Sequence, residues 1–312
     1  MLDSPALLSR ETLFGGEAWR LDNGRVRVQL LPAFGARIWT LADLDFGVQW
    51  VWHNPKVPLK TPADGASYDE NWAGGWEELF PNDALGSFDG RELPDHGEWW
   101  SSRWSAEEIE DGGRPAVRLT LATRAVAATC EKIVSLVEGR KAVRVRYRIE
   151  NTGKTELRFM LKQHLALSIE PGDRLELPGG ALRAVNPEFS TRLGSAGPFD
   201  WPTGRDKAGK PVDISLVPPQ GRDKEFVYVS DLPEGWAGVR RGERRLRMRF
   251  DKKIFPHCWF FMDFGGWNGL YTAVLEPCTQ WPKDMPEAAA AGRVAKMAPG
   301  EALETEVEVE LS

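Results

Sequence analysis

Short segments in which polar and apolar residues alternate recur along this chain of 312 residues. The cleanest runs from Val143 to Glu150, where apolar side chains alternate with three arginines and a glutamate. Successive side chains of a β-strand point to opposite faces, so this pattern is typical of a strand with one buried face. The C-terminal run 303–311 repeats the pattern, with glutamates at every second position that predict a solvated polar face.

Other segments of strand character are separated by turns rich in Gly, Pro, Asn and Asp. They lie at 25–31, 36–41, 117–121, 128–137, 156–170, 212–217, 225–230, 235–240, 244–251, 257–264 and 270–276. Helical character is confined to 284–291 and to a short turn at 76–80. Many strands with scarcely any helix predict an all-β fold, an antiparallel β-sandwich. No linker divides 1–312, so we expect a single domain with a long loop-rich covering segment at about 53–95.

The charge and the motifs narrow the classes of function. A formal net charge of −6 argues against a nucleic acid or an anionic membrane as the main partner. The basic run 240–253 contains alternating Leu246, Met248 and Phe250, so we interpret it as the exposed face of a strand. The chain has no serine-hydrolase elbow, no phosphate loop and no dinucleotide fingerprint in the required context. Neither its cysteines nor its histidines have metal-ligand spacing, so no metal and no cofactor are expected.

The remaining sequence signals concern the cellular setting. Three cysteines imply no disulfide framework. The N-terminal residues lack a basic region followed by an apolar one, and no apolar run reaches the roughly 18 residues that span a bilayer. A cytoplasmic location is therefore the expectation. Whether the protein is a monomer or a homodimer stays open.

One carboxylate lies in an unusually aromatic hairpin. The strands at 257–264 and 270–276 are joined by Gly265–Gly269, whose glycines and asparagine suit a tight reversal. Glu276 ends the second strand, and its aromatic surroundings predict poor solvation, which raises the pKa of a carboxyl group towards the range useful for proton transfer. The same pattern also fits a rim residue or a hydrogen-bonded structural acid.

The histidines are few, and His164 is the most informative. Between 157 and 169 the odd positions are apolar, so Lys162 and His164 fall on one face, away from the packed one. If that face lines a cleft, His164 points at a ligand; an exposed or structurally bonded histidine fits equally. His96 stands where the loop-rich segment meets a strand, which suits a site residue or a turn. Asp223 precedes another strand as a hydroxyl acceptor or a turn acid.

Taken together, these segments resemble the galactose mutarotase-like superfamily, the aldose 1-epimerases and their hexose-phosphate relatives. The resemblance covers nearly the whole chain and rests on motifs in the family's order: Gly74-Gly75 with Phe80-Pro81, Asp95-His96-Gly97, Lys162-Gln163-His164, Asp223 before Phe226, and Leu275-Glu276-Pro277. It implies a large antiparallel β-supersandwich with a sugar cleft on one concave sheet. It also implies the interconversion of α and β anomers of an aldose without a cofactor.

By this resemblance Glu276 removes the proton from the C1 hydroxyl while His164 protonates the ring oxygen. His96, Asp223 and Lys162 are expected to bind the substrate. The chain has 14 tryptophans, and flat indole rings suit sugar faces as well as plain packing. The tryptophans considered for stacking on the sugar are Trp76, Trp99 and Trp267.

Two departures from the family bear on the substrate. Arginines that the sugar-phosphate branch carries are replaced by Ala73, Trp100 and Ser102, which favours an unphosphorylated sugar. The galactose branch's Asn-Arg pair gives way to Glu77-Glu78. The alternatives are a carbohydrate-binding protein without catalysis, then a hexose-phosphate mutarotase or a polysaccharide lyase.

Overall fold

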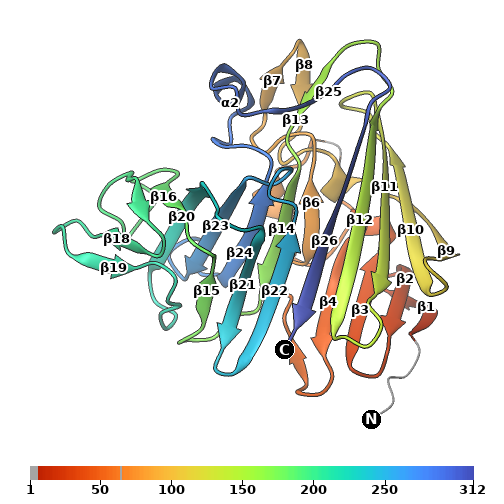
Figure 1. Cartoon of the computed structure of the whole chain (residues 1–312), viewed down its shortest axis with the longest axis horizontal. Helices are drawn as coiled ribbons and strands as arrows, with labels where there is room; N and C mark the ends of the chain where they lie inside the picture. The colour runs from red at the N-terminus through yellow and green to blue at the C-terminus, as the bar shows by residue number, and fades with distance from the viewer. Residues whose placement is uncertain (1–5, 64) are drawn as a thin grey trace.

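A computed structural model describes residues 6–63 and 65–312, and in this part of the chain the strands form two large antiparallel sheets (Figure 1). The larger sheet has 12 strands, in the order β1 (Leu7–Leu13), β2 (Gly16–Asp22), β3 (Val26–Leu31), β4 (Arg37–Asp43), β6 (Trp76–Leu79), β14 (Lys162–Leu167), β24 (Tyr271–Cys278), β23 (His257–Phe264), β20 (Asp223–Ser230), β16 (Ala181–Ala184) and β17 (Phe199–Asp200), with β5 (Val48–Gln49) beside β4. The smaller sheet has eight, in the order β15 (Arg174–Glu176), β21 (Trp236–Arg241), β22 (Arg244–Phe250), β26 (Ala302–Leu311), β12 (Ala142–Asn151), β11 (Ala128–Leu136), β10 (Pro115–Ala122) and β9 (Ser105–Glu110).

The remaining elements are short and lie outside the two large sheets. They are the hairpins β7 (Gly86–Phe88)–β8 (Arg91–Leu93), β13 (Leu157–Phe159)–β25 (Ala295–Met297) and β18 (Thr203–Arg205)–β19 (Pro211–Asp213), the helices α1 (Tyr68–Asn71) and α2 (Met285–Ala290), and the 3₁₀ turns η1 (Pro32–Phe34) and η2 (Trp99–Ser101). Figure 1 shows β18 and β19 projecting at the left of the molecule. Neither helix of the described residues has the length and apolarity to cross a membrane. The predicted all-β sandwich is confirmed.

The two sheets pack face to face, and alternation decides which side chains fill the space between them. In β12 the apolar Val143, Val145 and Ile149 are fully buried, and the intervening arginines lie on the outer face. There Arg144 pairs with Glu308 of the neighbouring β26, at 3.1 Å. The glutamates of 303–311 thus lie on a polar outer face, as predicted, where they form ion pairs with arginines of the adjacent strand.

Several predicted elements differ in detail from the structure. The segment Trp76–Leu79 is the strand β6, not a helical turn, because it pairs with β14 on one side and with Ile38 of β4 on the other. Tertiary pairing overrides the local helical preference of such a short run. The predicted strand 156–170 is divided into β13 and β14, and 212–217 contributes only β19. A further hairpin, β1–β2, precedes the first predicted strands.

Candidate functional site

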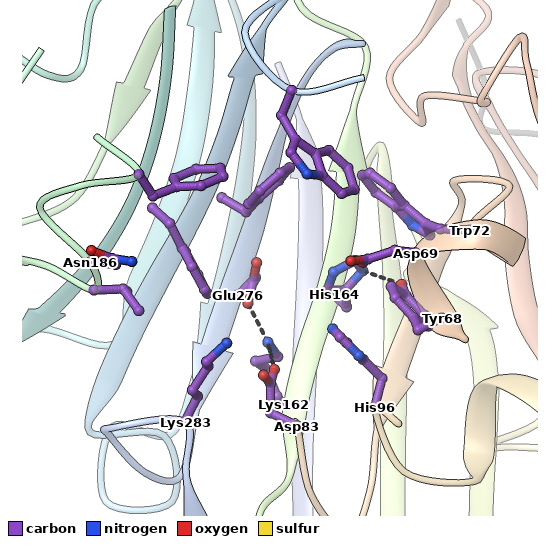
Figure 2. Close-up of a pocket in the computed structure, with 15 residues that line it drawn as sticks. Tyr68, Asp69, Trp72, Asp83, His96, Lys162, His164, Asn186, Glu276 and Lys283 are labelled. Atoms are coloured by element: carbon purple, nitrogen blue, oxygen red, sulfur yellow. Dashed lines mark hydrogen bonds and ion pairs between the residues drawn. The ribbon is translucent and has the colours of Figure 1, made fainter. Parts of the chain in front are cut away.

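A cavity of about 330 Å³ opens on the face of the larger sheet that is turned away from the smaller one (Figure 2). Its floor comes from neighbouring central strands, with Lys162 and His164 on β14, Glu276 on β24 and Phe261 on β23. Its walls come from the loop-rich covering segment and from the loops around 185–189, 267 and 283. Residues far apart in the sequence therefore converge on one hollow.

Strand β14 sends its polar side chains to two different places. Lys162 and His164 are two residues apart and both line the cavity, as the alternation predicts. Gln163 between them faces the smaller sheet, where its Oε1 accepts hydrogen bonds from Trp76 Nε1 at 2.9 Å and from the Tyr147 hydroxyl at 3.2 Å. The strand is buried along its whole length, so both sets of polar groups need partners.

Glu276 and Asp83, an acid that the sequence analysis did not single out, both contact the buried Lys162. Lys162 Nζ lies 2.6 Å from Glu276 Oε2 and 2.5 Å from Asp83 Oδ2. The Lys162 ammonium group is thus the charged partner of both carboxylates. Burial raises the pKa of Glu276 although Lys162 opposes it. For Asp83, burial is outweighed by Lys162, and its pKa is lowered.

His164 belongs to a second buried chain of polar groups. Its Nδ1 lies 3.2 Å from the Tyr68 hydroxyl, which also hydrogen-bonds Glu77 Oε1. The Arg37 guanidinium forms an ion pair with the other carboxylate oxygen of Glu77. Burial lowers the pKa of His164 well below its usual value, and the positive charge of Lys162 adds to this effect. The imidazole is therefore neutral at physiological pH.

Two glycines of the motifs that resemble the family are needed for steric reasons, because a side chain at either position would clash with a neighbour. Gly75 has φ +100°, and a Cβ there would lie 2.5 Å from Cδ of Arg37, so glycine leaves space for the side chain that pairs with Glu77. Gly97 has φ +69°, and a Cβ would lie 2.2 Å from the backbone oxygen of Phe80. This close approach holds the neighbouring His96 beside the cavity.

His96 lines the cavity wall, and the 3₁₀ turn η2 follows it in place of the expected strand. Its Nδ1 is 2.7 Å from Asp95 Oδ1, and its ring stacks on Tyr68 with centroids 4.0 Å apart. Burial opposes ionisation of Asp95, but the hydrogen bond from His96 outweighs it and the pKa of Asp95 is lowered. The stacking places His96 next to Tyr68, the hydroxyl partner of His164.

The rest of the cavity is aromatic. Trp267 lines it, as expected, and packs edge-on against Phe261, which in turn contacts Trp72, Phe189 and Phe226. The hairpin turn that carries Trp267 is held by Asp263, whose carboxylate accepts hydrogen bonds from the backbone N–H groups of Gly265, Trp267 and Leu270. Figure 2 shows Glu276, Lys162 and Asp83 close together, with His164 and Tyr68 beside them. The cavity thus has an apolar half and an acid–base half.

Three predicted binding residues do not line the cavity. Trp76 is fully buried between the sheets, on the opposite face of β6 from Glu77, and Trp99 packs in the core against Phe80 and Trp104. Neither indole can stack on a ligand in this cavity. Asp223 accepts a hydrogen bond from the Thr191 hydroxyl at 3.2 Å outside the lining residues. It lies three residues before Phe226 on β20, hence on the other face of that strand.

Sequence reasoning missed the contribution of the covering segment. Tyr68 and Trp72 come from α1 and its C-cap, and Asp83 follows β6. They carry no periodic signal because they lie in or beside irregular loops. The one available hint was that a loop of this length is usually functional. Among the described residues, no group of three or more His, Cys, Asp or Glu side chains is arranged to hold a metal ion.

Comparison with known proteins bears on the fold. No protein-family model and no curated protein sequence matches the chain. Solved structures do: a candidate aldose 1-epimerase from Klebsiella pneumoniae has a TM-score of 0.77 at 14% identity, over 97% of this chain and 83% of that one. A candidate aldose 1-epimerase from Escherichia coli K12 has a TM-score of 0.66 at 15% identity, over 98% and 99%. A galactose mutarotase-like protein from Clostridium acetobutylicum has a TM-score of 0.69 at 14% identity, over 99% of both chains. The chain therefore has the galactose mutarotase-like fold that its motifs predict.

Proposed function

We propose that the protein is an aldose 1-epimerase, which interconverts the α and β anomers of a free monosaccharide. The observation that carries the proposal is that a carboxylate and a neutral imidazole, Glu276 and His164, line the same cavity from adjacent strands. Anomer exchange needs one group that removes a proton and another that supplies one, both held on a single small molecule. The names of the structural neighbours point to the same reaction.

The proposed reaction assigns each group a step. Glu276 accepts the proton of the C1 hydroxyl while His164 donates a proton to the ring oxygen, and the ring opens to the aldehyde. Rotation about the C1–C2 bond presents the other carbonyl face, and closure reverses both transfers. Glu276 suits a base because its carboxylate lines the cavity from the floor. Lys162 beside it supports the ionised form that a base requires.

The other lining residues support a free sugar as substrate. Apolar C–H faces of a sugar suit the aromatic half around Trp267 and Phe261. We expect His96, which lines the cavity, to hydrogen-bond a hydroxyl group of the sugar. No arginine is among the described residues that line the cavity. Because phosphate recognition favours bidentate arginine, a phosphorylated substrate is the weaker proposal.

The test is anomer exchange followed by NMR across a panel of aldoses. The wild type should accelerate exchange, and Glu276→Gln and His164→Ala should each lower kcat by roughly 10²–10⁴-fold. His257→Gln is the matched control, because His257 is half-buried but does not line the cavity. If sugars bind to all variants and the wild type never accelerates exchange, the protein is a carbohydrate-binding module and the proposal is wrong.

A further inference from the structure

The buried chain behind His164 continues beyond the groups that an acid–base pair needs. Behind Nδ1 stand the Tyr68 hydroxyl and then the carboxylate of Glu77, with Arg37 at the far end. Tyr68 is 2% exposed and Glu77 is fully buried. Placing an acid and a phenol here without water costs free energy unless each is hydrogen-bonded, which these two are.

We infer that Glu77, Tyr68 and His164 form a proton wire that lets His164 act as acid and then as base while its ring stays neutral. The inference rests on the function proposed above and adds two positioning residues, Tyr68 and Glu77, that act through the imidazole. Tyr68 also lines the cavity, but proton exchange with the substrate is assigned to His164 alone, through Nε2, the nitrogen not joined to Tyr68.

The wire has two hydrogen-bonded arrangements. In the first, Glu77 carries the proton and donates to the Tyr68 oxygen, Tyr68 donates to Nδ1, and His164 offers an Nε2–H to the cavity. In the second, Glu77 is ionised, Tyr68 donates to Glu77, Nδ1–H donates to Tyr68, and Nε2 presents a lone pair. The first arrangement is an acid towards the cavity and the second is a base.

The proton count balances at each step. On ring opening, the substrate's C1–OH proton goes to Glu276 and its ring oxygen takes the Nε2 proton. Nδ1 then takes the Tyr68 proton, and Tyr68 takes the Glu77 proton. Ring closure reverses every transfer. Negative charge thus moves from Glu276 to Glu77. Each carboxylate has a cation beside it when it is ionised, Lys162 for Glu276 and Arg37 for Glu77.

Two electrostatic facts agree with a wire in which imidazolium is never formed. Burial and nearby cations lower the pKa of His164 well below its usual value, so a ring with a proton on both nitrogens is disfavoured. Burial raises the pKa of Glu77 although Arg37 opposes it, which makes the protonated arrangement accessible. A lone imidazole in this place would be a poor acid, whereas the wire lets it donate and be resupplied at once.

The chain contains a matched pair for the control. Glu78 follows Glu77 in β6 but faces the smaller sheet, where its Oε1 accepts a hydrogen bond from the Tyr147 hydroxyl at 2.6 Å. Lys132 supplies the cation. Tyr147→Phe on β12 and Glu78→Gln on β6 therefore remove the same kinds of buried groups without touching the cavity.

The experiment measures kcat and KM for anomer exchange in H₂O–D₂O mixtures. For Tyr68→Phe and Glu77→Gln we expect kcat to fall by about 10²-fold or more with KM changed only a few-fold. The curved dependence on deuterium content in the wild type, which reports several protons in motion, should become linear. Tyr147→Phe and Glu78→Gln should keep both kcat and the curvature.

A second readout needs no turnover. Nitrogen-15 NMR of His164 should show a neutral ring at neutral pH, with a tautomer ratio that changes in Tyr68→Phe and not in Tyr147→Phe. Wild-type kcat and curvature in Tyr68→Phe and Glu77→Gln would overturn the wire and leave the proposed function standing. If no aldose responds to the wild type, the proposed function fails, and an unchanged tautomer ratio in Tyr68→Phe then refutes the wire by itself.

Discussion

Lys162 holds two buried carboxylates, and replacing it by methionine tests how much the site depends on that one charge. The side chains of Lys162, Asp83 and Glu276 are 2%, 4% and 1% exposed. Methionine has a similar length and no charge. Since the two contacts measure 2.5 and 2.6 Å, the carboxylate oxygens lie at most about 5 Å apart.

The magnitude follows from this geometry. Two like unit charges about 5 Å apart repel by roughly 3 kcal/mol at an effective dielectric constant of about 20. Removing one partner of a buried ion pair typically costs about 3–5 kcal/mol. We therefore expect Lys162→Met to lower the free energy of unfolding by about 3–5 kcal/mol at neutral pH. One carboxyl group will also take up a proton to relieve the repulsion.

Urea unfolding across pH measures both effects. In the variant the carboxyl pKa is higher in the folded than in the unfolded state, so stability is lost as the pH rises and regained as it falls. The difference between wild type and Lys162→Met should therefore shrink in acid. Adding Asp83→Asn to Lys162→Met removes the second charge and should restore part of the stability. A loss below about 1 kcal/mol that does not vary with pH would refute this reasoning.

Three further predictions concern the cavity and its surroundings. Trp267→Ala removes a lining ring and should raise KM roughly tenfold with little change in kcat, by steady-state anomer exchange; an unchanged KM would mean that the ring does not contact the sugar. Because burial raises the pKa of Glu276, kcat/KM should fall as the pH falls through that raised value, and a rate independent of pH on the acid side would contradict Glu276 as the base. Burial lowers the pKa of His257 from 6.5 to about 4, so the unfolded chain binds its proton more readily. Stability is then fully present above pH 6.5 and is lost, by up to roughly 3 kcal/mol, as the pH falls to about 4. Urea unfolding of His257→Gln should show correspondingly weaker acid dependence, and equal slopes would contradict the prediction.

The parts of the site that lie on regular strands could be predicted from the sequence. Two-residue alternation is a local property, so it placed Lys162 and His164 on one face before any tertiary contact was known. The hairpin that carries Glu276 follows from its turn residues, and β23 and β24 confirm it. Trp267 lies in the same turn and lines the cavity.

The parts supplied by loops could not be predicted. Nothing in the sequence distinguishes Trp76 and Trp99 from Trp267 as candidates for stacking on a sugar. Only tertiary packing decides that the first two fill the core. Tyr68 and Asp83 reach the cavity through segments without periodicity, so no pattern tells which way they point. Asp223 fits a motif in order and spacing, but the face of β20 on which it lies depends on a register set by its neighbour β23.

The consecutive acids of β6 have a consequence for how that strand finds its place. Glu77 and Glu78 point to opposite faces, and each meets its own cation there, Arg37 on one side and Lys132 on the other. A slip of β6 by one residue would exchange the faces and part both carboxylates from their cations. A misaligned β6 would therefore leave two buried carboxylates without their cations. The free-energy cost of both would favour the native register of this strand during folding.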